Sequence, residues 1–284
     1  MILVPDELLK LWGEVTDGSR SEQDFARQQE QLLKGYCLRW SSALLRNGET
    51  DLRTSLLHEI ADYYKIPEVS EVERRCRNAV GTLRREWEEG VRSPDRATVE
   101  SFYESPATVY DLMEWHSLLE DNGALAYVLG LDIAQSYDVG SCLDFGSGVG
   151  SGALLLICSG IEMTLADIST TLLKFARWRI NTRGLQAHFV DLKEKPLPTA
   201  EFDMILAMDV FEHLVDPVKT VNQLWKALKP GGLLFARIHA DDDPDRPQHI
   251  VRDFGPTFNR MAELGLAEKW SDRWLWGHKL FQKR

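Results

Sequence analysis

The sequence has few cysteines, and none of them stand at the spacing of a metal site. The four are Cys37, Cys76, Cys142 and Cys158, and no two form a C-x-x-C pair. This spacing favours reduced, buried thiols over a disulfide framework or a zinc cluster. We therefore expect no redox or zinc chemistry and place no metal among the site residues.

Long hydrophobic runs and an excess of cations are also lacking. The stretch Ala153 to Cys158, the longest strictly apolar one near the middle, is far shorter than the ~20 residues that cross a bilayer. Met1 to Asp6 has neither the basic start nor the apolar core of an export signal. Lys and Arg total 33 against 44 Asp and Glu, a net charge of -11. We expect a cytoplasmic protein that spans no membrane and does not bind nucleic acid as its main partner.

What the first third does have is helical periodicity. With 44% apolar residues in 284, the chain can bury a sizeable core. A capping box of Ser19 and Glu22 begins a helix that Asn47-Gly48 ends, and a second helix covers Asp51 to Tyr64. A third follows from Ser70 past Trp87. We predict an all-helical domain over residues 1–100, with lead-in helices over 101–136.

From residue 140 onward, short apolar runs alternate with helical ones, which is typical of a parallel sheet covered by helices. The last two runs are too close together to enclose a crossover helix and should pair as an antiparallel hairpin. The expected strands are Ser141–Phe145, Ile161–Ala166, Ala187–Val190, Asp203–Ala207, Leu233–His239, Leu266–Trp270 and Leu275–Gln282. The fold class is therefore α/β, Rossmann-like, with a seven-stranded, mostly parallel sheet after the helical domain.

The most informative segment, Leu143 to Gly152, has an acidic residue and four alternating glycines between a strand and a helix. Glycines let backbone N–H groups approach a ligand closely, and a helix N-terminus favours a negative group. Asp144 would repel a pyrophosphate but would accept hydrogen bonds from an ammonium group. Gly148-x-Gly150-x-x-Ala153 also matches a loose dinucleotide fingerprint, so the loop alone does not decide the ligand.

Acidic residues also end the next two strands. Asp167 is placed to accept hydrogen bonds from both hydroxyls of a ribose, and Asp191 could accept one from an adenine amino group. The fourth strand runs into Asp209 to His213, and a Pro-Gly turn within Lys229 to Gly232 precedes the fifth. This order predicts a ligand that contains adenosine.

From about Tyr137 to its end, the chain resembles the class I S-adenosylmethionine-dependent methyltransferases. The resemblance rests on the glycine loop, the acidic strand ends, the Asp209-x-x-Glu212-His213 segment, the Lys-Pro-Gly-Gly turn and the closing hairpin. It is strongest toward the small-molecule branch that includes ubiquinone-pathway and natural-product methyltransferases. The Asn/Asp-Pro-Pro-Tyr segment of members that methylate nucleic-acid bases is missing after the fourth strand, in agreement with the acidic charge.

The resemblance implies a set of cofactor-binding residues. Asp144, Gly146, Ser147, Gly148 and Gly150 would cradle the methionine part, and Asp167 would hold the ribose. Ile168, Asp191 and Leu192 would meet the adenine, Asp209 and Val210 would lie beside the sulfonium, and Tyr110 stands where relatives place an aromatic lid. Asp209, Glu212 and His213 are also donors of the kind that hold a divalent cation in some relatives, but one short cluster is too little to close a metal site.

The implied reaction is methyl transfer to an oxygen, nitrogen or carbon of a small molecule, free or bound to a carrier. A proton-accepting histidine is expected among His213, His239 and His249, because these follow strands whose carboxyl ends form the ligand edge. The helical domain would cover that edge, or bind a partner such as a carrier protein or a second copy of the chain. Two alternatives are cofactor binding without methylation and, with less support, a nicotinamide-dependent oxidoreductase.

Overall fold

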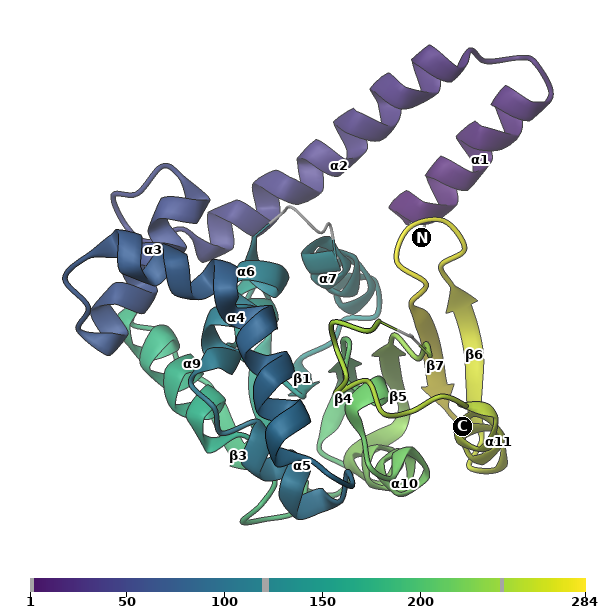
Figure 1. Cartoon of the computed structure of the whole chain (residues 1–284). Coiled ribbons are helices and arrows are strands. Elements are labelled where there is room, and N and C mark those ends of the chain that lie inside the picture. The colour runs from purple at the N-terminus through teal and green to yellow at the C-terminus, as the bar shows by residue number, and fades with distance from the viewer. Residues whose placement is uncertain (1–2, 119–122, 241–242) are drawn as a thin grey trace.

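The computed structural model describes residues 3–118, 123–240 and 243–284 (Figure 1). Its centre is a seven-stranded sheet in the order β3-β2-β1-β4-β5-β7-β6, in which β1 to β5 are parallel and β7 is antiparallel to both neighbours. The strands are β1 Ser141–Phe145, β2 Glu162–Asp167, β3 His188–Asp191, β4 Phe202–Ala207, β5 Leu228–Ala236, β6 Leu266–Ser271 and β7 Lys279–Lys283. The predicted fold class is confirmed, including the closing hairpin.

Two strand starts differ from the prediction by more than one residue, and the fifth strand ends at Ala236 instead of His239. The fifth strand begins at Leu228 instead of Leu233, because it includes the Pro-Gly segment and pairs with β4 across a register shift. The last strand begins at Lys279 instead of Leu275, because the Asp272 carboxylate accepts hydrogen bonds from four successive backbone N–H groups, those of residues 274–277. This cap holds the segment as a turn.

Helices cover both faces of the sheet. The first face carries α7 Ala126–Ser136, α8 Ser151–Cys158 and α9 Thr170–Thr182, and the second carries α10 Pro217–Ala227 and α11 Gly255–Glu263. Side chains alternate along each strand, so Cys142 packs in the first hydrophobic cluster and Leu143 in the second. Both clusters are buried, which places the ligand site at an edge of the sheet.

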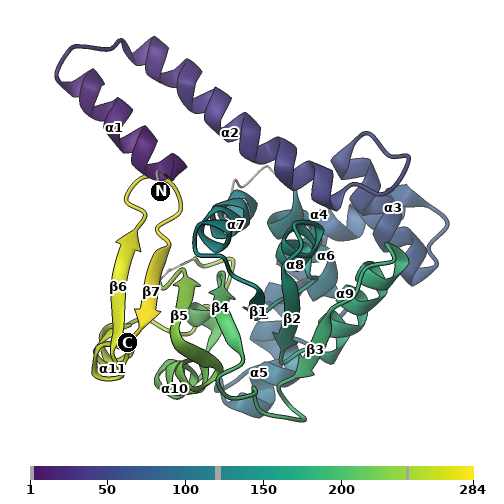
Figure 2. The same cartoon turned by 180° about the vertical axis from the view of Figure 1, so that it is seen from behind.

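The amino-terminal helices are α1 Val4–Thr16, α2 Glu22–Leu44, α3 Leu52–Tyr64, α4 Val69–Gly90, α5 Arg96–Phe102 and α6 Ala107–Ser117. Helices α1 and α2 form an arm that leaves the body and returns to the β6–β7 hairpin (Figures 1 and 2). There Trp12, Phe25 and Trp274 pack edge to face or tilted. No described helix is both long and apolar enough to cross a membrane.

Helix starts were predicted less accurately than helix locations. Sequence analysis assigned no helix to Val4–Thr16, and α2 is capped by Ser21, whose Oγ accepts the Asp24 N–H at 3.0 Å, instead of by Ser19. Likewise, α4 begins at Val69, so Ser70 lies inside its first turn. Neighbouring serines are equivalent by pattern, and only the path of the preceding chain selects the cap.

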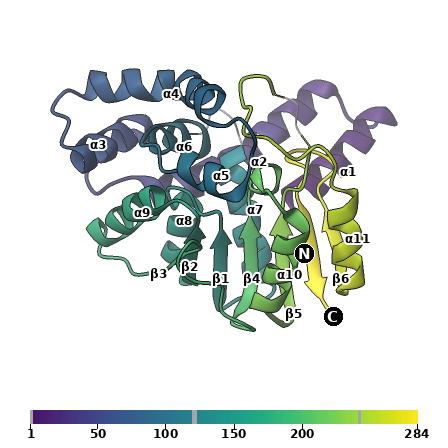
Figure 3. The same cartoon turned by 60° about the horizontal axis from the view of Figure 1, so that its bottom comes forward.

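The helical part packs directly on the sheet part. Its side chains Trp40, Ile60 and Val72 belong to the same hydrophobic cluster as Phe175 of α9 and Leu206 of β4. Helices α4, α5 and α6 lie over the carboxyl ends of the parallel strands (Figure 3). A division at residue 100 stays a prediction, but the two parts share one core.

Candidate active site

A cavity of about 510 Å³ lies between the carboxyl ends of the strands and helices α4 to α6. The glycine loop with Asp167, the segment after β4 and the loop after β5 all contribute to its lining. Of the predicted site residues, those that line it are Gly146, Ser147, Gly148, Asp167, Ile168, Leu192, Asp209, Val210, His213, His239 and His249. The topology therefore brings most of the predicted residues together.

The glycine loop is shaped by positive backbone angles that favour glycine. Gly146 has φ +71°, and a Cβ there would lie 2.4 Å from Cγ2 of Val210. Gly148 has φ +51°, and its Cβ would lie 2.9 Å from Cδ1 of Leu112. Gly150 lies behind the loop, where a Cβ would meet Leu165 and Ala176. The first two glycines therefore keep the cavity wall as bare backbone.

Asp144 lies beneath this loop, fully buried and outside the cavity lining. Neither of its carboxylate oxygens has a hydrogen-bond partner among the described residues, and the Ser147 hydroxyl is equally unpartnered. Burial, reinforced by the charge of Asp167, raises the pKa of Asp144 to about 7. Unsatisfied polar atoms are costly in a protein interior, so this end of the loop is suited to a polar ligand.

Asp167 is the carboxylate that faces the cavity. Its Oδ2 accepts the Gly148 N–H at 2.9 Å and its Oδ1 accepts the Ser169 N–H at 2.8 Å. Burial raises its pKa to about 6, opposed by these backbone N–H groups. The carboxylate is therefore held in one orientation, with lone pairs left for ligand hydroxyls.

Asp191 does not reach the cavity. Its carboxylate accepts the Thr170 hydroxyl at 2.6 Å and the Lys193 N–H at 3.0 Å, which fixes the turn after β3. Leu192, the next residue, lines the cavity instead. The expected contact of Asp191 with an adenine amino group is not supported by this geometry, because its oxygens are engaged in the local turn.

Tyr110 is also turned away from the cavity. Its ring stacks on Tyr64 with centroids 5.3 Å apart, and its hydroxyl accepts a hydrogen bond from Arg75 at 3.3 Å. The lid position expected for it is not observed, because this face of α6 packs against α3 and α4. Leu112 and Trp115, on the opposite face of the same helix, line the cavity.

Asp209 follows β4 and lines the cavity in a left-handed conformation, with φ +50°. Its Oδ1 accepts a hydrogen bond from Arg237 at 2.8 Å, and its Oδ2 is 3.9 Å from Nδ1 of His116. Burial alone would raise the pKa of Asp209, but His116 and Arg237 hold it below the usual value. Asp209 therefore carries a negative charge at neutral pH.

Four histidines line the cavity, namely His116, His213, His239 and His249. The rings of His213 and His249 pack edge to face, with centroids 4.7 Å apart. Burial, followed by the proximity of His249, lowers the pKa of His213 to about 3. His213 is therefore neutral at physiological pH, and its Nδ1 lies 3.1 Å from the Gln248 carbonyl oxygen, which fixes that nitrogen as the donor.

Glu212, His213 and His249 offer ligand atoms that all lie within 4.8 Å of one another. Two imidazoles and a carboxylate are a set that can hold a divalent cation. Asp209, the third donor considered from sequence, does not belong to it because Arg237 occupies that carboxylate. That no metal takes part in the reaction stays a prediction, and chelation would test it.

Comparison with known proteins identifies the α/β part. A methyltransferase-domain family model matches residues 143–236. Demethylmenaquinone methyltransferase of Thermus thermophilus is 32% identical over 108 residues, which are 37% of this chain and 49% of that protein. Ubiquinone biosynthesis O-methyltransferase of Xylella fastidiosa is 35% identical over 99 residues, 33% of this chain and 39% of that protein. A solved structure from Pyrococcus horikoshii aligns at a TM-score of 0.48 and 16% identity, covering 59% of this chain and 93% of its own.

Residues 143–236 are therefore a methyltransferase domain, and this part of the chain is similar to small-molecule methyltransferases. The chain spans less than half the length of these two curated relatives. The cofactor of these enzymes is S-adenosylmethionine, and the loop of this methyltransferase domain fits it. The unpartnered Asp144 and Ser147 atoms suit a ligand with an ammonium and a carboxylate group, and Asp167 suits the ribose.

Sequence analysis missed several residues that line the cavity of the methyltransferase domain. Tyr103 is one, and its buried hydroxyl has no partner among the described residues. Burial raises its pKa far above the ordinary value, and its ring packs edge to face on His213 at 5.9 Å. Trp115, His116 and Arg237 are three further examples. Three of these four come from α6 or the segment before it, where periodicity predicts a buried face but not what that face contacts.

Proposed function

We propose that this protein transfers a methyl group from S-adenosylmethionine to a hydroxyl of a small molecule bound in the cavity. The observation that carries the proposal is that one cavity is lined both by the glycine loop with Asp167 and by a group of histidines. A hydroxyl acceptor is favoured because it must lose a proton, and unprotonated imidazoles can accept it. The names of the two relatives described above agree with a small-molecule acceptor.

S-adenosylmethionine supplies, when bound, a methyl group activated by a sulfonium. The residues that would hold it are the glycine loop, with Asp144 beneath it, at its amino-acid end, Asp167 at the ribose, and Ile168 with Leu192 at the adenine. Ile168 packs in a small hydrophobic cluster with Leu83 and Phe102 of the overlying helices, so α4 and α5 would close over the adenine. Such closure excludes water and holds the reacting groups in line.

His249 is the residue we assign as the proton acceptor. It is 8% exposed and lines the cavity. Its loop is anchored to the segment after β4, because the Ile250 and Val251 N–H groups both donate to the Glu212 carbonyl oxygen, at 2.8 and 3.1 Å. His213, with its strongly lowered pKa, is better suited to orient its neighbour than to accept a proton. Recognition of a carrier protein or a second copy by the helical part stays a prediction.

A ligand panel tests the proposed cofactor. We expect S-adenosylmethionine and S-adenosylhomocysteine, each at ~100 times its dissociation constant, to stabilise the protein by ~2.7 kcal/mol. This corresponds to a rise of several degrees in the melting temperature, whereas NADH should give none. The measurement is thermal unfolding of the full chain. Stabilisation by NADH alone would contradict the proposal and make the dinucleotide reading of the loop correct.

The raised pKa of Asp144 predicts how stability depends on pH. A carboxyl whose pKa rises from about 4 when unfolded to about 7 when folded contributes stability at low pH that is lost as the pH rises toward 7. Asp144→Asn should therefore stabilise the ligand-free protein at pH 8, by on the order of 3 kcal/mol, and leave it unchanged at pH 4. Chemical denaturation at both pH values measures the difference.

Glu104→Gln is the matched control, because the pKa of Glu104 is shifted in the opposite direction. Although burial opposes the shift, hydrogen bonds from Lys193 and Thr171 lower the pKa of Glu104 to about 2. Its contribution is present at neutral pH and is lost as the pH falls, so this variant should be destabilised at pH 8. An Asp144→Asn protein no more stable than the parent at pH 8 would show that the carboxylate has a partner in solution.

A further inference from the structure

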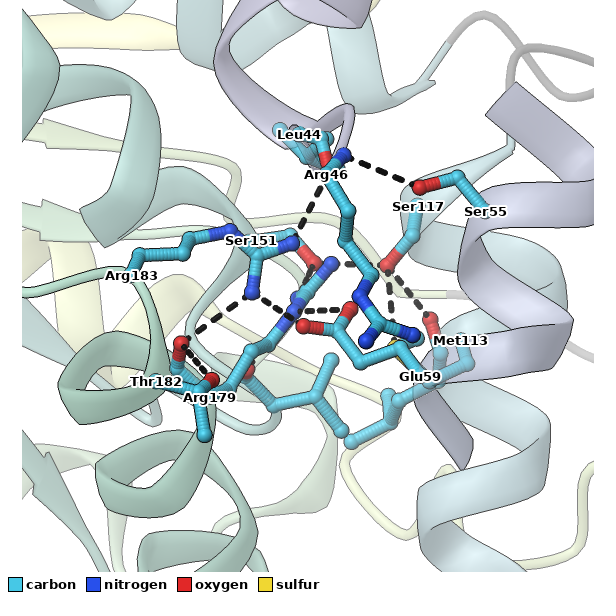
Figure 4. A network of polar contacts seen from close by, with 12 residues as sticks. Leu44, Arg46, Ser55, Glu59, Met113, Ser117, Ser151, Arg179, Thr182 and Arg183 are labelled. Carbon is cyan, nitrogen blue, oxygen red and sulfur yellow. Dashed lines mark hydrogen bonds and ion pairs between the residues drawn. The ribbon is translucent and has the colours of Figure 1, made fainter. Parts of the chain in front are cut away.

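A buried group of charged side chains joins the helical part to the methyltransferase domain. Glu59 of α3 and Arg179 of α9 are 1% and 0% exposed, and Nε of Arg179 donates to Oε2 of Glu59 at 2.7 Å (Figure 4). Arg183, one turn further along α9, donates to the other Glu59 oxygen and to the Leu44 carbonyl oxygen at the end of α2. The carboxylate of Glu59 is therefore held by two guanidinium groups.

Arg179 also contacts the loop proposed to bind the cofactor. Nη1 of Arg179 donates to the Val149 carbonyl oxygen at 3.2 Å and to Oγ of Ser151 at 2.6 Å. These two residues flank Gly150 and line the cavity. The Ser151 hydroxyl also lies 2.6 Å from the hydroxyl of Ser117 at the end of α6 (Figure 4). A chain of polar contacts thus runs from α3 through Arg179 to the loop and on to α6.

Stability alone does not explain this group. Burying a guanidinium costs free energy, and well-packed apolar residues are often as stabilising as a buried ion pair. Burial lowers the pKa of Arg179 to about 10, so the group remains charged at neutral pH. Its Nη2 has no partner among the described residues, which adds to the cost. The planar guanidinium of Arg179 does, however, hold its N–H groups in a fixed orientation toward the Val149 carbonyl and the Ser151 hydroxyl.

We propose that Glu59 and Arg179 are positioning residues that hold the glycine loop in the conformation that binds the amino-acid end of the cofactor. Glu59 fixes the guanidinium, and the guanidinium fixes the backbone on both sides of Gly150. The helical part would then contribute to cofactor affinity through α3, without touching the cofactor. This inference rests on the proposed function, because it concerns the same site.

The test uses the full chain with Glu59→Met and Arg179→Met combined, so that neither charge is left buried alone. Binding of S-adenosylhomocysteine is compared with that of methylthioadenosine, which lacks the amino-acid part. We expect the dissociation constant of the first to rise about tenfold or more, since small displacements of binding groups are costly, and that of the second to stay within about twofold. A merely structural role would not separate the two ligands.

Arg53→Met combined with Glu114→Met is the matched control. This ion pair also joins α3 to a neighbouring helix, at 3.0 Å, and neither of its residues lines the cavity. It should leave both dissociation constants unchanged. If the first double variant fails to fold, Arg179→Lys replaces it. This variant keeps the positive charge but lacks the planar guanidinium, so we expect it to weaken binding of S-adenosylhomocysteine and not of methylthioadenosine.

Each result bears on one claim. A folded double variant that binds S-adenosylhomocysteine as the parent does overturns the positioning role, and so does an equal loss for both ligands. Failure of the parent protein to bind S-adenosylhomocysteine overturns the proposed function instead. Circular dichroism and thermal unfolding of every variant establish that the compared proteins are folded.

Discussion

Replacing His249 by alanine is expected to lower kcat ~10²–10⁴-fold, the range for loss of a general base. The dissociation constant of S-adenosylhomocysteine should stay within about twofold, because the residue lies in the loop after β5, outside the elements proposed to hold the cofactor. The measurement is transfer of a labelled methyl group to an acceptor found by screening phenolic and other hydroxyl compounds. Cofactor binding measured calorimetrically on the same preparation separates a lost base from a damaged fold.

Two other histidines provide controls for this experiment. His239→Ala should change kcat less than about threefold, because that side chain is exposed at the rim of the cavity. His116→Ala tests the histidine beside Asp209 that sequence analysis missed. A large loss in either variant, with an active His249→Ala protein, would move the base to that residue.

Chelation decides between proton transfer and metal binding at the same side chains. With a histidine base, EDTA should leave methyl transfer unchanged. Loss of activity with EDTA, restored by a divalent cation, would instead assign Glu212, His213 and His249 as metal ligands. Metal titration of the His213→Ala variant would then locate the site independently of activity.

Asp167→Ala is the second large effect, and we expect it to weaken S-adenosylhomocysteine binding ~10²-fold or more. A hydrogen bond to a charged group contributes ~1.5–3 kcal/mol, and this carboxylate has lone pairs available for two ribose hydroxyls. It also holds the Gly148 and Ser169 N–H groups, so its removal loosens the loop as well. Isothermal titration calorimetry measures the change.

Asp191→Ala tests whether Asp191 contacts the adenine, as the family resemblance implies, or only stabilises the local turn, as the structure indicates. The resemblance assigns Asp191 to the adenine amino group, whereas the structure engages its carboxylate with Thr170 and Lys193. We therefore expect its cofactor affinity to stay within about threefold of the parent. A loss as large as that of Asp167→Ala would show that the turn after β3 rearranges to meet the adenine.

Much of the methyltransferase part was predictable because its signals are local. A strand is marked by a short apolar run, and the glycine loop by residues that only a tight turn explains, so Gly146 and Gly148 could be placed before their positive φ angles were seen. The closing hairpin followed from the short distance between two strands. Parallel topology then brings the strand ends to one edge, which is why Asp167, Asp209 and His249 meet in one cavity.

Helix periodicity, by contrast, states which face is buried but not what it is buried against. Tyr110 and Leu112 stand two residues apart on α6, and only packing decides that the first meets Tyr64 and the second the glycine loop. His116 is a candidate site residue only because α6 packs over the edge of the sheet and brings this side chain to the cavity. Glu59 and Arg179 are 120 residues apart, and the sequence pattern of neither helix predicts that these two side chains form an ion pair.

The sequence by itself determined the sheet, the glycine loop and the likeness to a methyltransferase domain, because these depend on short-range patterns and on chain order. The tertiary structure alone decided which helical residues face the cavity and which acidic strand end reaches it. The physical reason is that a side chain's partner depends on how two elements are rotated and spaced. That arrangement is a property of the whole packed core, which here includes both the helices and the sheet.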